Sequence, residues 1–171
     1  MKKVKAFAIP STPMIQTALS KTDFSDCFAT TNHSESLDSI SKEIFGKLPK
    51  WVRPLLHLRN FLVKFLGLKM EMPKGYHNRF EPGGYVGFFK IFEVSSTEIL
   101  LGLNDKHLDF RVSILKDSSP IYNIKVSTLV SFNNKLGSYY MKVVAPFHVL
   151  VIQSMIKQAF NPNATIHEIP S

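Results

Sequence analysis

The residues best suited to chemistry lie in one short stretch between Asn104 and Arg111. Four polar or charged side chains recur there at every second position: Asp105, His107, Asp109 and Arg111. In a strand, Asp109 and Arg111 project from one face, opposite to Leu108 and Phe110. On a solvated face the two charges form an ordinary ion pair that contributes little to stability. On a face turned inward they orient the polar head of a ligand. Because apolar faces normally point inward, the solvated ion pair is the favoured interpretation of Asp109 and Arg111.

A further candidate is Arg59, which falls in a predicted helix over about residues 50–66. The arginine lies off the polar stripe of that helix, so its charge needs a partner or a route to water. It can pair with Asp105 or Asp109 and tie the helix to the later strands. It can equally bind a carboxylate or phosphate on a ligand, and the tie is the favoured interpretation.

The remaining reactive side chains give no catalytic signature. His148 falls in the first turn of a predicted last helix, where a neutral imidazole can cap the helix or line a cavity mouth. A histidine facing solvent is favoured over a general base, because the sequence shows no partner for it. The histidines are too dispersed for a metal site, and no P-loop or Gly-x-Ser-x-Gly motif occurs, so no metal or cofactor is expected. Cys27 is the only cysteine, which excludes an internal disulfide.

The composition favours one globular domain over residues 1–171, with an N-terminal arm over 1–20 and a loose tail over 161–171. Hydrophobic residues make up 44% of the sequence, and 14 Phe against one Trp indicate an aromatic-rich interior or an apolar pocket. The formal charge of +8 allows anionic partners, but the charges are scattered and are interpreted mostly as a solvated surface. No basic-aromatic stripe is present, so nucleic-acid binding is not expected.

No apolar run reaches about 18 residues, so no integral membrane span is expected. The apolar run at the N-terminus is cut at Pro10, which makes it too short for a signal peptide. The expected location is therefore the cytoplasm. The sequence gives no indication of the oligomeric state.

Apolar periodicity predicts a sheet framed by helices. Strands are expected over 23–31, 85–94, 97–103, 108–116, 122–132 and 136–144, a short helix over 37–45, and the helix over 50–66. Pro146 is taken as the start of a long buried helix that Pro162 ends. The strands follow one another at hairpin distance, which predicts an antiparallel sheet. The resulting α+β layout is a curved antiparallel sheet wrapped around a long C-terminal helix, with two shorter helices after the first strand. A space between sheet and helix is where apolar ligands bind.

Several blocks resemble a bacterial family of unknown function, DUF2867. The specific parts are Leu58-Arg59-Asn60 and Asp105-Lys106-His107-Leu108-Asp109-Phe110-Arg111, within a match from about Asp23 to Phe160. The family looks like a member of the START-like (SRPBCC) superfamily, so the resemblance implies a helix-grip fold. The resemblance supports the presence of a ligand cavity more strongly than it supports any particular reaction.

Three hypotheses for function follow. The first is a binding protein that holds a hydrophobic small molecule between sheet and last helix, through Arg59, His107, Asp109, Arg111 and His148. The second is an enzyme acting on such a molecule, with His107, Asp109 or His148 as acid or base. The third is peripheral membrane association through the basic amphipathic helix over 50–66.

Overall fold

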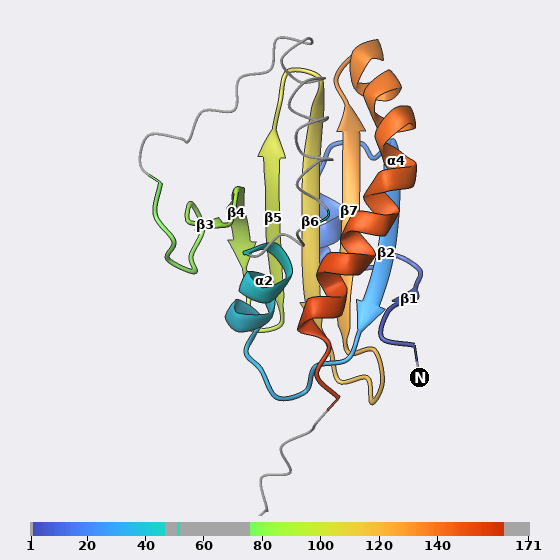
Figure 1. Ribbon diagram of the computed structural model, residues 1–171. Helices are drawn as coiled ribbons and strands as arrows, with labels where there is room; N and C mark the ends of the chain where they lie inside the picture. Colours follow the sequence, from blue (N-terminus) through green and yellow to red (C-terminus); the bar gives the residue numbers. More distant parts are fainter. Residues whose placement is uncertain (1, 47–50, 52–75, 163–171) are drawn as a thin grey trace, which may run out of the picture.

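The computed structural model describes residues 2–46, 51 and 76–162, and this part has an α+β architecture built on one open sheet (Figure 1). The strands are β1 (Lys5–Ala6), β2 (Phe24–Thr30), β3 (Tyr85–Val86), β4 (Phe89–Val94), β5 (Glu98–Asn104), β6 (Leu108–Lys116) and β7 (Ile124–Phe132). The helices are α1 (Pro13–Thr17), α2 (Leu37–Phe45) and α4 (Lys135–Ile156), which the short 3-10 helix η1 (Lys157–Ala159) follows. Neighbouring strands are antiparallel, in the order β1-β2-β7-β6-β5-β4-β3.

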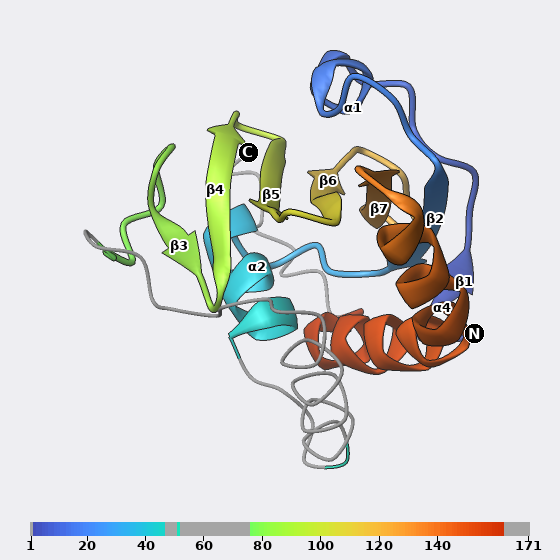
Figure 2. The same cartoon turned by 90° about the horizontal axis from the view of Figure 1, so that it is seen from above.

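The helices lie on different sides of the sheet. Figure 2 shows α2 and α4 on one side, here called the helix side, and α1 on the other, here called the outer side. The strands at both edges lean toward the helix side, so the sheet bends around α2 and α4. The first long strand, β2, pairs along its whole length with the last strand, β7. This pairing brings an early and a late segment of the sequence together beneath α4.

The hydrophobic core lies on the helix side. Alternate residues of β6, Val112 and Ile114, are fully buried there, as the period of two predicts. They pack with further strand residues and with residues of both helices: Phe28, Ile91, Ile99, Leu101, Ile124, Val126, Ile40, Ile44, Phe45, Ile152, Met155 and Ile156. Each large side chain buried in this way contributes about 1.5–3 kcal/mol.

The hairpin predicted around residues 104–107 is confirmed. β5 and β6 pair in continuous register from Glu98 opposite Leu115 to Asn104 opposite Asp109. In the turn, Oδ1 of Asp105 accepts a hydrogen bond from the backbone N–H of His107, 3.2 Å away. An aspartate that binds the backbone two residues on is a common turn former.

The strand predicted over 136–144 is wrong, because these residues form the first part of α4. The side chain of Asn134 accepts a hydrogen bond from the N–H of Gly137, 3.2 Å away, and so caps the helix. Pro146 lies inside this helix instead of starting it. The apolar residues of 136–150 recur every three or four positions as well as in alternation, and the cap decides in favour of the helix.

The single strand predicted over 85–94 is also wrong, since it divides into the hairpin of β3 and β4. Gly87 adopts a φ of +60° at the turn, a conformation that other residues rarely adopt. A Cβ on Gly87 would also lie 2.6 Å from the carbonyl oxygen of Phe45. The turn therefore approaches the C-terminal end of α2 closely.

Two predicted segments lie outside the described residues. They are most of the helix over 50–66, of which only Trp51 is described, and the tail from residue 163 onward. The indole N–H of Trp51 donates to Oγ of Ser154 on α4, at 3.3 Å.

Candidate functional site

A histidine and an aspartate meet on the helix side of the sheet. Nε2 of His148, on α4, lies 3.3 Å from Oδ2 of Asp26, on β2. Both side chains are largely buried, with exposed fractions of 16% and 15%. The ring of Phe24 stands edge-on to the imidazole, with the ring centroids 6.1 Å apart. The predicted solvent-facing position of His148 is therefore not what the structure shows, because the helix turns this residue toward the sheet.

The strand alternation explains why Asp26 points inward. Phe24, Asp26 and Phe28 share one face of β2, and Phe28 belongs to the core. The register places Asp26 opposite Thr128 of β7, which is fully buried. A carboxylate and a hydroxyl thus occupy adjacent positions between apolar residues of that face.

The polar atoms of this group lack hydrogen bonds from the described part of the chain. Both carboxylate oxygens of Asp26, Oγ1 of Thr128 and Nε2 of His148 are buried without a hydrogen-bond partner there. The 3.3 Å contact between Asp26 and His148 is within ion-pair range but is not aligned as a hydrogen bond. Most buried polar groups in proteins are satisfied, so a cluster of unsatisfied ones suits a ligand that brings its own donors. We call Asp26, Thr128 and His148 the interior polar cluster.

Sequence reasoning found His148 but missed its partners. The signal for Asp26 was a carboxylate between Phe24 and Phe28 in the pattern of a half-buried strand. Thr128 likewise belongs to the alternate residues of β7 that point to the helix side. Only the pairing of β2 with β7 brings these two residues beneath α4.

His107 contributes to a different place, at the start of α4. Its Nδ1 lies 2.8 Å from Nδ2 and 3.1 Å from Oδ1 of the cap residue Asn134. Its backbone oxygen accepts a hydrogen bond from the N–H of Asn133, 2.9 Å away. These contacts join the β5–β6 turn to the first turn of α4, and they give His107 a structural role.

Asp109 and Arg111 lie on the outer side of the sheet, away from the interior polar cluster. The side chain of Arg111 is nevertheless buried, because its guanidinium stacks on Phe92 with 3.7 Å between Cζ and the ring centroid. Its Nη1 donates to the backbone oxygen of Phe110 at 2.9 Å. Desolvation lowers the pKa of Arg111, and the negative charge of Asp109 opposes that shift. The structure therefore does not turn Asp109 and Arg111 toward α4, as the ligand-binding interpretation of this pair required.

A family model described as a protein of unknown function, DUF2867, matches residues 18–155. The chain belongs to this family. The matched range contains β2, α4 almost to its end, and the whole interior polar cluster. No curated protein and no solved structure gave a significant match to the chain.

Two further residues of this DUF2867 protein were considered in the sequence, Arg59 and Cys27. Arg59 lies outside the described residues, so its tie to the hairpin stays a prediction. Cys27 is buried on the outer side, opposite Ser127, and burial raises the pKa of its thiol. Within residues 2–46, 51 and 76–162, no group of three or more His, Cys, Asp or Glu side chains is arranged to hold a metal ion.

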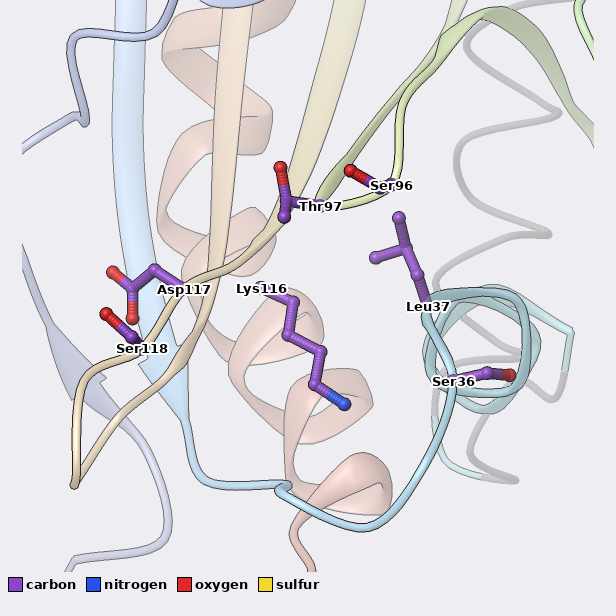
Figure 3. A pocket seen from close by; sticks show the side chains of 7 residues that line it. All are labelled: Ser36, Leu37, Ser96, Thr97, Lys116, Asp117 and Ser118. Atoms are coloured by element: carbon purple, nitrogen blue, oxygen red, sulfur yellow. The ribbon is translucent and has the colours of Figure 1, made fainter.

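A surface pocket of about 660 Å³ lies at one end of the sheet of this DUF2867 protein (Figure 3). It is lined by the start of α2, the β4–β5 turn and the end of β6: Ser36, Leu37, Ser96, Thr97, Lys116, Asp117 and Ser118. Its charged groups already have partners, since Nζ of Lys116 donates to the backbone oxygen of Glu35 and Asp117 forms an ion pair with Lys125. The interior polar cluster therefore remains the stronger candidate site.

Proposed function

We propose that this DUF2867 protein binds a small molecule between the sheet and α4, with an apolar body and a polar head that donates hydrogen bonds. The observation that carries the proposal is the interior polar cluster, in which both oxygens of Asp26 are buried without a donor. The core residues Phe28, Val112 and Val126 lie next to Asp26 and Thr128 in the register of the sheet and suit an apolar body. A hydroxyl or ammonium group would supply the donors that the carboxylate lacks.

The arrangement of the elements supports the same proposal. An antiparallel sheet bends around a long C-terminal helix, and the first long strand pairs with the last (Figures 1 and 2). This order suits the helix-grip layout of START-like proteins, to which we assign the chain as part of the proposal. In that layout the ligand lies between sheet and helix, where His148 meets Asp26.

Matched probes test this proposal. Decylamine, 1-decanol and decanoate share one alkyl chain, and they differ in whether the head donates hydrogen bonds or carries negative charge. Isothermal titration calorimetry should detect binding of the amine and the alcohol and little binding of decanoate, because Asp26 repels an anionic head. Asp26→Asn should weaken amine binding about tenfold or more, since the charge-assisted hydrogen bond is lost. Asp109→Asn, on the outer side, is the matched control and should leave binding unchanged.

Two results would contradict the proposal. One is the failure of all three probes to bind up to their solubility limits. The other is equal loss of binding in Asp26→Asn and Asp109→Asn. Native mass spectrometry of the protein purified from cells offers an independent measurement, because a co-purified ligand appears as an added mass that Asp26→Asn reduces.

A second candidate function is acid–base catalysis on the bound molecule. The supporting observation is the 3.3 Å contact of His148 with Asp26, since a carboxylate beside an imidazole can orient it for proton transfer. His107, Asp109 and His148, which the sequence suggested for this role, do not meet: His107 lies at the start of α4 and Asp109 on the outer side. If the protein converts a bound molecule, His148→Gln should slow that conversion by a larger factor than it weakens binding.

A further inference from the structure

Five exposed apolar side chains form a stripe along α4, here called the α4 stripe: Leu136, Tyr139, Val143, Phe147 and Leu150. Their spacing of three and four positions places them on one face of the helix. Their exposed fractions run from 45% for Phe147 to 66% for Tyr139, so none is covered by the sheet. At the rise of an α-helix, the α4 stripe extends over about 21 Å.

The opposite face of α4 is part of the core. Met141, Ile152, Met155 and Ile156 are buried there. By length and composition alone Lys135–Ala159 is apolar enough to cross a membrane, a test that core helices also pass, yet only 22% of its most apolar window is buried. Since its core face is held by the sheet, the geometry suits a helix that lies in a membrane surface and not one that spans the bilayer.

The charges on α4 and η1 are of one sign. α4 and η1 contain three lysines, Lys135, Lys142 and Lys157, and no aspartate or glutamate. All three lysines are exposed, and their positions on the helix fall along one edge of the α4 stripe. Just after this helix, Nζ of Lys3 lies 5.4 Å from the ring centroid of Phe160, which brings a basic residue of the N-terminal segment next to it.

We propose that the α4 stripe docks on the surface of an anionic lipid membrane. The apolar side chains of the α4 stripe enter the boundary between headgroups and acyl chains, and the lysines at its edge reach the lipid phosphates. Anionic lipid fits the absence of acidic residues from this helix, because each lysine near such a surface adds to the attraction. A second copy of the chain fits less well, since pairing two such helices brings their lysines together. This surface faces away from the interior polar cluster, so the inference does not depend on the proposed function.

Vesicle flotation tests the inference with the intact protein. Wild-type protein should float with vesicles of phosphatidylcholine containing 30% phosphatidylglycerol and should stay behind with phosphatidylcholine alone. Val143→Ser/Phe147→Ser should lower the partition coefficient at least about tenfold, because two apolar side chains no longer enter the bilayer. Lys135→Glu/Lys142→Glu should lower it at least about tenfold through charge. Raising the salt concentration should weaken the binding of the wild type.

Matched controls remove the same kinds of side chain elsewhere. Phe88 and Ile121 are 57% and 51% exposed, so Phe88→Ser/Ile121→Ser removes two exposed apolar groups away from α4. Arg79→Glu/Lys90→Glu changes the net charge by the same amount at exposed positions outside α4 and the turn that contacts it. Both controls should float within about twofold of the wild type. Far-UV circular dichroism verifies that every variant is folded.

Three outcomes would overturn the inference. The first is that wild-type protein does not bind anionic vesicles, a result that needs no variant. Controls that lose binding as strongly as the α4 variants would show that the attraction is not located on this helix. A dimer in sedimentation velocity that Val143→Ser/Phe147→Ser dissociates, without vesicle binding by the wild type, would assign the α4 stripe to a second copy instead.

Discussion

Nε2 of His148 on α4 lies 3.3 Å from Oδ2 of Asp26 on β2, and neither atom has a hydrogen-bond partner among the residues that the structure describes. The helix thus places an imidazole against a carboxylate that the strand turns toward the core. Burying a carboxylate without donors costs free energy, and a nearby imidazole that is not aligned as a donor offsets only part of that cost. Such a cost is typical of a site that is completed by a ligand.

Replacing Asp26 by asparagine should stabilise the unliganded protein by about 1 kcal/mol. The amide has nearly the same shape as the carboxylate, but a neutral group costs less to bury. Urea denaturation of ligand-free protein measures the change in the free energy of unfolding. Asp109→Asn on the outer side is the comparison, with an expected change of at most about 0.5 kcal/mol. If Asp26→Asn loses stability, the carboxylate is a structural group and the argument for a ligand is weakened.

Gly137→Ala should destabilise the protein by about 1–3 kcal/mol, although alanine favours helices over glycine by about 1 kcal/mol. A Cβ at this position would lie 2.1 Å from the backbone oxygen of His107, so α4 would have to move away from the β5–β6 turn. Thermal and urea denaturation measure the loss. Ser138→Ala, one position further along the same helix, should change stability by less than about 0.5 kcal/mol. Equal stability of the two variants would mean that the contact between helix and turn yields easily.

The sequence predicted secondary structure best in segments whose apolar residues follow only one periodicity, either that of a strand or that of a helix. The alternation over 108–114 gave β6 with the correct inward face, because Val112 and Ile114 are fully buried there. It failed at 136–144, where alternation and helical spacing coexist and the cap at Asn134 decided the outcome. Asn134 was a readable signal, since asparagine is a preferred cap.

The site was less accessible to sequence reasoning, because its members are joined only by tertiary contacts. Asp26 and His148 are more than a hundred positions apart, and the pairing of β2 with β7 and the rotation of α4 are needed to bring them together. The burial of Arg111 depends on Phe92, which lies where the register of β4 shifts between Ile91 and Glu93. Such a register shift re-aims a side chain in a way that a regular period of two does not predict.

Arg111→Lys should lower the free energy of unfolding by about 1–3 kcal/mol. A planar guanidinium stacks on Phe92 and donates to Phe110, whereas an ammonium offers no flat face and is more strongly hydrated. Chemical denaturation measures the change. Arg79→Lys is the control, since its pair with Glu81 is exposed and the same exchange should cost little there. A loss no greater than that of the control would show that the stacked geometry contributes nothing specific to arginine.

Asp117→Asn should lower stability at neutral pH and have a smaller effect in acid. Burial opposes ionisation of this carboxyl, but hydrogen bonds from Lys125 and Ser119 outweigh it and lower the pKa of Asp117. A carboxyl with a lowered pKa in the folded state contributes stability above its unfolded pKa of about 3.9. That contribution is lost as the pH falls through the folded pKa. The difference between wild type and Asp117→Asn, at most about 1 kcal/mol, should therefore be full at pH 6 and shrink below about pH 4.

Urea denaturation at pH 3, 4, 5 and 6 measures this dependence. Asp38→Asn is the matched control, because Asp38 forms a partly exposed ion pair with Lys42, four positions along α2, and should contribute less than about 0.5 kcal/mol. A difference for Asp117→Asn that grows as the pH falls would reverse the expected sign. It would mean that burial, and not the contacts with Lys125 and Ser119, controls the ionisation of this carboxyl at the end of β6.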